Sequence, residues 1–140
     1  DIKSTGLLAN VLAKQSARNA GAHEAWLVDA DDNITEGTST NAWIVTEGGI
    51  LVTRHLDNHI LGGVTRRALL ECAESLGISI EERAFSRTEA LNAAEAFSSA
   101  STVGALPVIS IDKNQVSNGR PGPMTQKLNG FYRERAGNIL

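Results

Sequence analysis

The chain has 140 residues, of which 41% are hydrophobic and 21% charged, with a formal net charge of −3 at pH 7. These ordinary globular values exclude a disordered or fibrous chain, and the lack of a basic surplus argues against nucleic-acid or anionic-membrane partners. No apolar run is long enough to span a bilayer. The single cysteine, Cys72, excludes an internal disulfide.

The length predicts one domain, residues 1–140. The chain begins at Asp1 and its one methionine is Met124. Because a natural reading frame starts with Met, we expect a processed or cleaved chain, or a piece of a longer protein. The lone cysteine and the lack of an export signal predict a cytoplasmic location.

The first half of the chain predicts a helix followed by short strands. Residues 7–20 carry Leu7, Leu8, Val11 and Leu12 on one helix face, which leaves Lys14, Gln15 and Arg18 to solvent. Strands are predicted at 24–29, 41–46 and 50–54, with a turn at 31–33 and a tight hairpin at 47–49.

The second half continues the alternation of helices and strands. An apolar face from Val64 to Leu76 predicts a helix that ends at Gly77. The other elements predicted here are strands at 78–85, 95–99 and 106–111, a short helix at 86–93 capped by Ser86 and Glu89, and a last helix from Pro123. Interleaved helices and hairpins predict an α/β (α+β-like) fold, in which helices pack on a mixed sheet.

Two features that resemble reactive sites have plainer interpretations. His55 and His59 have the i, i+4 spacing of zinc ligands on a helix, but their segment lacks helical periodicity and no third ligand is evident. We therefore expect no metal site and interpret both as solvated loop histidines. Cys72 lies on an apolar helix face, which indicates a small buried side chain.

Three polar segments are candidates for binding a charged group. Gly62–Thr65 runs from a flexible turn into a helix, whose N-terminus can hold an anion; the alternative is a simple helix start. The hydroxyl-rich turn at 98–102 can form a second wall of the same site, or be an ordinary polar loop. Residues 36–41 place Glu36 among small residues, either beside a bound group or in a solvated turn.

These segments, in order, resemble the class IV aminotransferases, the fold-type IV enzymes of pyridoxal 5'-phosphate (PLP), and are most similar to D-amino acid aminotransferases. The resembling pieces are Asp1–Ser4, Leu7–Gln15, Glu24–Ala25, Thr35–Gly37 with Asn41, Ile60–Arg66, Ser101–Pro107 and Gly119–Leu128. Each motif is weak alone, but the ordered set extends over nearly the whole chain. The resemblance implies a mixed sheet or partly closed barrel, the large C-terminal domain of such enzymes.

The resemblance also implies a role for each matching residue. Lys3 matches the lysine that forms the Schiff base with PLP and moves a proton at the substrate alpha carbon. Glu36 matches the carboxylate that keeps the pyridine nitrogen protonated. The remaining matches are Leu61 against one face of the ring, Gly63, Val64 and Thr65 at the phosphate, and Ser101 and Thr102 in the second phosphate-binding turn.

The chain departs from the family pattern in two places. Ser101 stands where threonine is common, which keeps the hydroxyl, and Gly104 stands where an acidic residue is frequent. The family also carries a smaller N-terminal domain before the lysine, which supplies an arginine for the phosphate and much of the substrate pocket. We therefore expect this chain alone to be inactive or weakly active.

The implied reaction transfers an amino group between an amino acid, D-alanine being favoured, and a 2-oxo acid. The alternatives are a class IV lyase similar to aminodeoxychorismate lyase, a branched-chain or amine transaminase, and a non-catalytic fragment that needs its missing domain. The resemblance further implies a homodimer, and it leaves a separate N-terminal fragment as a further partner.

Overall fold

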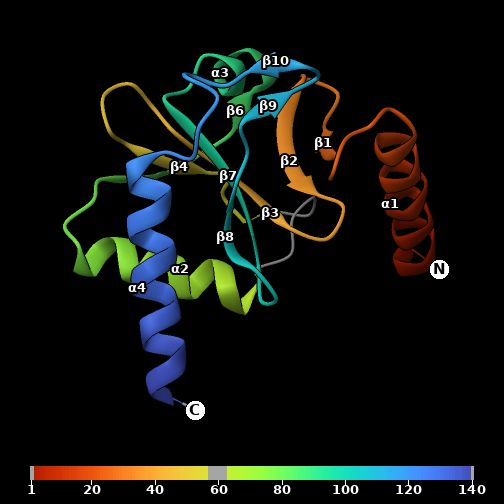
Figure 1. Cartoon of the computed structure of the whole chain (residues 1–140). Helices are drawn as coiled ribbons and strands as arrows, with labels where there is room; N and C mark the ends of the chain where they lie inside the picture. Colours follow the sequence, from red (N-terminus) through yellow and green to blue (C-terminus); the bar gives the residue numbers. More distant parts are fainter. Residues whose placement is uncertain (1, 57–62, 140) are drawn as a thin grey trace.

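The computed structural model describes residues 2–56 and 63–139, and the side chains of residues 11–56 and 63–137. Helices and strands alternate along the chain (Figure 1). The helices are α1 (Ile2–Asn19), α2 (Val64–Ser75), α3 (Arg87–Leu91) and α4 (Pro123–Ile139). The strands are β1 (Trp26–Val28), β2 (Asn33–Gly37), β3 (Asn41–Val45), β4 (Leu51–Thr53), β5 (Ile80–Glu82), β6 (Phe85–Ser86), β7 (Glu95–Ala100), β8 (Gly104–Pro107), β9 (Ser110–Ile111) and β10 (Asn114–Gln115).

A five-stranded sheet in the order β5-β4-β3-β7-β8 forms the centre. β4 and β5 run parallel, whereas the other neighbouring pairs in this sheet are antiparallel, so the sheet is mixed as predicted. The described residues form two further sheets, β1-β2-β6 and β10-β9.

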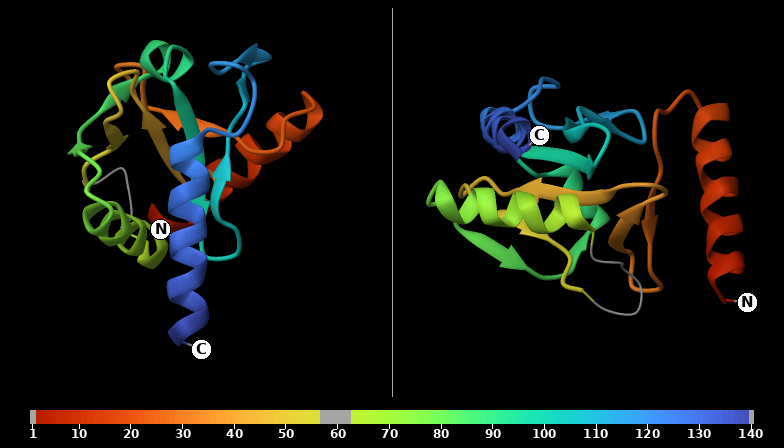
Figure 2. Two further views of the ribbon diagram at one scale, coloured as in Figure 1. Left: turned by 60° about the vertical axis from the view of Figure 1, so that its left-hand side comes forward. Right: turned by 90° about the horizontal axis from the view of Figure 1, so that it is seen from below.

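The core lies on both faces of the central sheet because successive side chains of a strand point to opposite sides. On one face, Trp43 and Val45 of β3 pack with residues of α2 and α4, which contact each other there (Figures 1 and 2). On the other face, Ala42 and Ile44 pack against Phe85 and the smaller sheets. Cys72 is 1% exposed in the first cluster, which confirms its predicted burial.

Helix α1 confirms the predicted first helix but begins earlier, at Ile2. Val11 and Leu12 are 56% and 61% exposed, because α1 stands apart from the central sheet on the side of β1 (Figures 1 and 2). Gln15 and Arg18 are exposed as predicted, but Lys14 is half-buried. Lys14 still reaches solvent, because its side chain lines an open cavity that Arg18 lines as well.

Strand β2 lies where the sequence predicts a turn and a polar run. Its segment contains one aliphatic side chain, Ile34, which is 3% exposed. β2 is a strand because it pairs with β1 on one side and with β6 on the other. The predicted turn itself is confirmed by Asp32, whose φ of 64° closes the hairpin between β1 and β2.

Two predicted strands are each divided between sheets. The segment 78–85 forms β5 in the central sheet and ends at β6 in the three-stranded sheet, and 106–111 contains the end of β8 and all of β9. The predicted cap of the short helix is confirmed, because it depends only on neighbouring residues: the Ser86 hydroxyl accepts from the Glu89 N–H at 3.0 Å. The Glu89 carboxylate, however, binds Arg83. Among the described residues, no helix is long and apolar enough to cross a membrane.

Candidate active site

A cavity of about 490 Å³ opens beside the ends of β2 and β7 and the beginnings of β3 and α2. It gathers Glu36, Thr65 and Ser101, which are far apart in the sequence but were each predicted to border one site. The full lining is Glu36, Gly37, Thr38, Ser39, Thr40, Asn41, Gly63, Val64, Thr65, Ser99, Ala100 and Ser101. The predicted residues Gly63 and Val64 therefore lie at the same cavity.

The N-terminus of α2 forms one side of this cavity. Gly63 is its N-cap, with an extended backbone and no side-chain cap, and α2 has no acidic residue in its first turn. The first N–H groups of a helix lack intrahelical partners and carry a partial positive charge. Thr65 is 6% exposed and adds a hydroxyl, which lies 3.5 Å from the hydroxyl of Tyr132 on α4. This end of α2 can thus hold an anion such as a phosphate.

The close approach between Gly63 and Asn41 of β3 leaves little room for a side chain at position 63. A Cβ there would come within 3.3 Å of Asn41 Oδ1, tighter than most contacts of this kind. Glu36 lies at the end of β2 beside this junction and is half-buried. A carboxylate and a helix N-terminus therefore border the same space, which suits a ligand with a cation at one point and an anion at another.

The last residues of β7 complete the wall and include Ser99, which belongs to the hydroxyl-rich segment 98–102 that the sequence predicted to border the site. Ser99 is 1% exposed, and its hydroxyl accepts from the indole N–H of Trp43 at 2.8 Å. The predicted turn is shorter than 98–102, because Ser99 pairs with Asn41 of β3 and so lies within β7.

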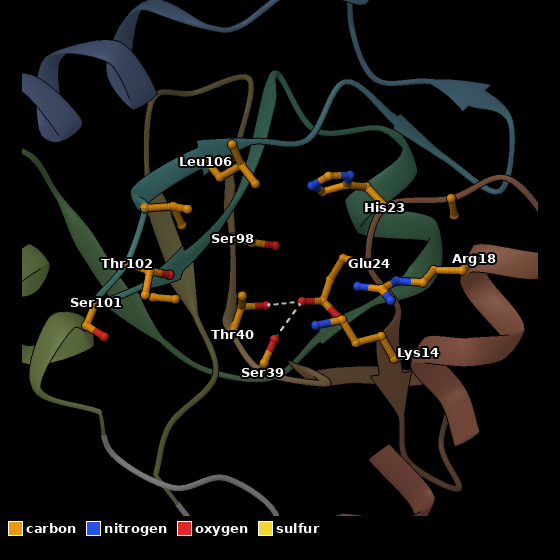
Figure 3. A pocket seen from close by; sticks show the side chains of 13 residues that line it. Lys14, Arg18, His23, Glu24, Ser39, Thr40, Ser98, Ser101, Thr102 and Leu106 are labelled. Atoms are coloured by element: carbon orange, nitrogen blue, oxygen red, sulfur yellow. Dashed lines mark hydrogen bonds between the residues drawn. The ribbon is translucent and has the colours of Figure 1, made fainter. Parts of the chain in front are cut away.

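A second cavity of about 460 Å³ adjoins the first and shares four residues with it: Ser39, Thr40, Ala100 and Ser101. Lys14 and Arg18 of α1 reach into it from one side, opposite Leu106 of β8 (Figure 3). Thr102 lines this second cavity and is not among the residues that line the first. Of the two hydroxyls expected in the second phosphate-binding turn, Ser101 alone borders both cavities.

Three sequence predictions extend to parts of the chain that the structure does not describe in full. Lys3 lies in the first turn of α1, but its side chain is outside the described part. Leu61 and His59 lie outside the described residues altogether. Within the described ranges, no cluster of three or more His, Cys, Asp or Glu side chains has the arrangement to hold a metal ion.

The comparison with known families identifies the family of this chain. A family model described as amino-transferase class IV matches residues 1–111. This chain belongs to the class IV aminotransferases. The family resemblance expected from the ordered motifs is therefore confirmed.

Known relatives of this class IV chain include D-alanine aminotransferases. The Bacillus licheniformis protein is 41% identical over 128 residues, covering 91% of this chain and 44% of that protein. The Listeria innocua protein is 37% identical over 134 residues, covering 96% and 46%. The chain thus spans less than half the length of these relatives.

Solved structures of class IV enzymes share the fold. The branched-chain amino acid aminotransferase of Thermobaculum terrenum, in its PLP form, matches with a TM-score of 0.88 at 32% identity, covering 94% of this chain and 43% of that one. The branched-chain aminotransferase of the archaeon Thermoproteus uzoniensis, with norvaline, matches with a TM-score of 0.85 at 34% identity, covering 91% and 42%.

Proposed function

We propose that this chain is the cofactor-binding part of a PLP-dependent aminotransferase, which moves an amino group between an amino acid and a 2-oxo acid. The observation that carries the proposal is the convergence of Glu36, Thr65 and Ser101 on one cavity at the N-terminus of α2. The similarity to D-alanine aminotransferases, higher in identity than that to the branched-chain enzymes, supports D-alanine and related D-amino acids as the donors.

The residues at the cavity fit PLP. A helix N-terminus with the hydroxyls of Thr65 and Ser101 beside it suits a phosphate, and a half-buried carboxylate suits a protonated ring nitrogen. A volume of about 490 Å³ is typical of a cofactor site. When bound, PLP supplies an aldehyde that condenses with amines and a protonated ring that withdraws electrons.

Each residue then has a distinct task. The backbone amides of Val64 and Thr65 and the hydroxyls of Thr65 and Ser101 bind the phosphate, and Gly63 leaves room for it. Glu36 holds a proton at the ring nitrogen, and the Leu61 side chain packs on the ring. Thr102 borders the adjoining cavity, next to Ser101.

Lys3 is the catalytic residue of the proposal. Its amine holds the cofactor and, once released, moves the proton at the substrate alpha carbon. An amine suits this work when burial and neighbouring cations lower its pKa. We further propose that the chain forms a single domain of the full-length gene product, and that this gene product is a cytoplasmic homodimer.

Borohydride reduction tests the assignment of Lys3. The full-length gene product is incubated with PLP, reduced and mapped by peptide mass; we expect a pyridoxyl group on Lys3. Lys3→Ala should lose this label and lower transamination by about a thousandfold or more. Lys14→Ala, a lysine on the same helix, is the matched control and should keep the label. An unlabelled Lys3 in the wild-type protein would overturn the proposal.

The same protein tests the substrate. We expect D-alanine and 2-oxoglutarate to yield pyruvate, faster than L-leucine yields its oxo acid. A transaminase needs the 2-oxo acid acceptor, whereas a lyase releases pyruvate from its own substrate without one. If D-alanine with the acceptor yields no pyruvate, the D-alanine assignment is wrong even where Lys3 carries the label.

A further inference from the structure

One carboxylate outside the cofactor cavity accepts an unusual number of hydrogen bonds. Glu24 Oε1 accepts from the N–H groups of Ala25 at 3.0 Å and Thr38 at 3.2 Å, and from the Thr38 hydroxyl. Its Oε2 accepts from the hydroxyls of Ser39 at 3.2 Å and Thr40 at 3.5 Å (Figure 3). A single side chain before β1 thus binds three consecutive residues of the loop between β2 and β3.

That loop begins two residues after Glu36, at Thr38, and closes tightly. The Gly37 N–H donates to the Thr40 carbonyl at 2.8 Å, and the Thr38 N–H also reaches the Ala25 carbonyl at 3.1 Å. A Cβ on Gly37 would collide with the Thr40 hydroxyl, so the turn depends on glycine. Because Thr38, Ser39 and Thr40 all line the cavity of Glu36, their position sets one wall of the cofactor site.

The ionised form of Glu24 suits this task. Burial raises the pKa of the Glu24 carboxyl, but hydrogen bonds from Thr38, Ala25 and Ser39 outweigh it and hold the pKa below its ordinary value. Lys14 and Arg18 of α1 line the cavity that Glu24 faces, so two cationic side chains share that cavity with its charge (Figure 3). An apolar side chain would leave hydroxyls of the loop without their common acceptor.

We propose that Glu24 is a positioning residue, which holds the loop 38–40 so that Glu36 stays aligned with the cofactor ring nitrogen. The inference rests on the proposed function, since it assigns Glu24 a task toward the PLP that Glu36 would bind. Glu24 touches neither cofactor nor substrate in this assignment. It acts through the loop, much as carboxylates that hydrogen-bond to metal ligands orient those ligands.

The test uses the full-length gene product loaded with PLP that is labelled with ¹⁵N in the ring. The resonance of this nitrogen reports whether it holds a proton. Glu24→Ala should move the resonance toward its unprotonated position and raise the dissociation constant of pyridoxamine 5'-phosphate about tenfold. Glu24→Gln keeps the size and one acceptor oxygen, so it should fall between wild type and alanine.

Two controls separate positioning from general stabilisation. Glu47→Gln changes an exposed glutamate in the hairpin between β3 and β4 and should leave the resonance and the dissociation constant unchanged. Glu24→Ala with Thr38→Ala should be no worse than Glu24→Ala alone, because both changes break the same contact. A role limited to stability would lower the urea midpoint without moving the resonance of the folded protein.

The outcomes distinguish this inference from the proposed function. If the wild-type protein binds no PLP, the proposed function and this inference both fall. If the wild-type protein binds PLP and both Glu24 variants keep its resonance and dissociation constant, the inference alone is overturned. Should Glu24→Ala not fold, the same measurements on Glu24→Gln decide.

Discussion

At the scale of single residues, Glu95 shows how one buried carboxylate positions a whole helix. It is 8% exposed on β7 and accepts from the N–H groups of Met124 at 3.0 Å and Thr125 at 2.8 Å, and from the Thr125 hydroxyl at 2.8 Å. These donors lie in the first turn of α4, whose N–H groups have no partner within the helix. Gly122, just before the helix, lies so close to the Glu95 carboxyl that a Cβ would overlap it.

Gly122→Ala should therefore destabilise the fold, by about 1–3 kcal/mol, since the buried carboxylate must move from its donors. Gly130→Ala is the matched control, because Gly130 lies within α4 and a Cβ there meets nothing within 4 Å. It should stabilise the protein by about 0.5–1 kcal/mol, as alanine favours a helix over glycine. Urea unfolding measures both, and equal effects of the two changes would contradict this account of Glu95.

At the scale of elements, β7 connects the two faces of the central sheet to the two cavities. Successive side chains of β7 point to opposite faces of the sheet. The Ser98 hydroxyl accepts from the Trp26 indole N–H at 2.9 Å on one face, and the Ser99 hydroxyl accepts from the Trp43 indole N–H on the other. Trp43 is fully buried and stacks on Phe97 with ring centroids 5.3 Å apart. Trp26 is half-buried. The same strand thus contributes side chains to the core on both faces of the sheet, and it ends at the turn that is proposed to bind phosphate.

The two serines should differ when replaced. Ser99→Ala leaves the buried Trp43 N–H without an acceptor and should lower the free energy of unfolding by about 1–3 kcal/mol. Ser98→Ala should cost less than about 1 kcal/mol, because water can reach the partly exposed Trp26. Urea unfolding followed by tryptophan fluorescence compares the two, and a larger loss for Ser98→Ala would refute the assignment.

At the scale of the whole molecule, several carboxylates accept more hydrogen bonds when folded than an unfolded chain offers. The pKa of Glu24 is lowered as described above. The Asn33 N–H, helped by Arg54, lowers the pKa of Asp29, and Arg83 lowers the pKa of Glu89. Each carboxyl group therefore binds its proton more weakly in the folded state than in the unfolded one.

The sign of the pH dependence follows from these shifts. Stability from a carboxyl with a lowered folded pKa is present above its unfolded pKa, near 4.5 for Glu24, and is lost as pH falls through the folded value. The urea midpoint should hold from pH 7 to about 5.5 and fall below about pH 5. Glu24→Gln should flatten this fall, whereas Glu47→Gln should leave it unchanged. A midpoint that rises on acidification would contradict the prediction.

Local features of the fold were predictable because they depend on residues a few positions apart. The helix from Val64, the Ser86 cap and the tight turn at Gly49, whose φ is 82°, all follow from nearby side chains and glycine freedom. The predictions failed where pairing at a distance decides. β2 has a polar sequence and is a strand because β1 and β6 flank it.

For the candidate site, the sequence by itself determined the family, through ordered motifs that carry a lysine, a carboxylate and a helix start that is proposed to bind phosphate. Only the tertiary structure decided which of these residues share a cavity. It joins Glu36, Thr65, Ser99 and Ser101, and places Thr102 in the neighbouring cavity. The physical reason is sequence distance: the Trp43–Ser99 bond spans 56 residues. Such contacts arise from strand pairing and packing, which no pattern of neighbouring residues in the sequence predicts.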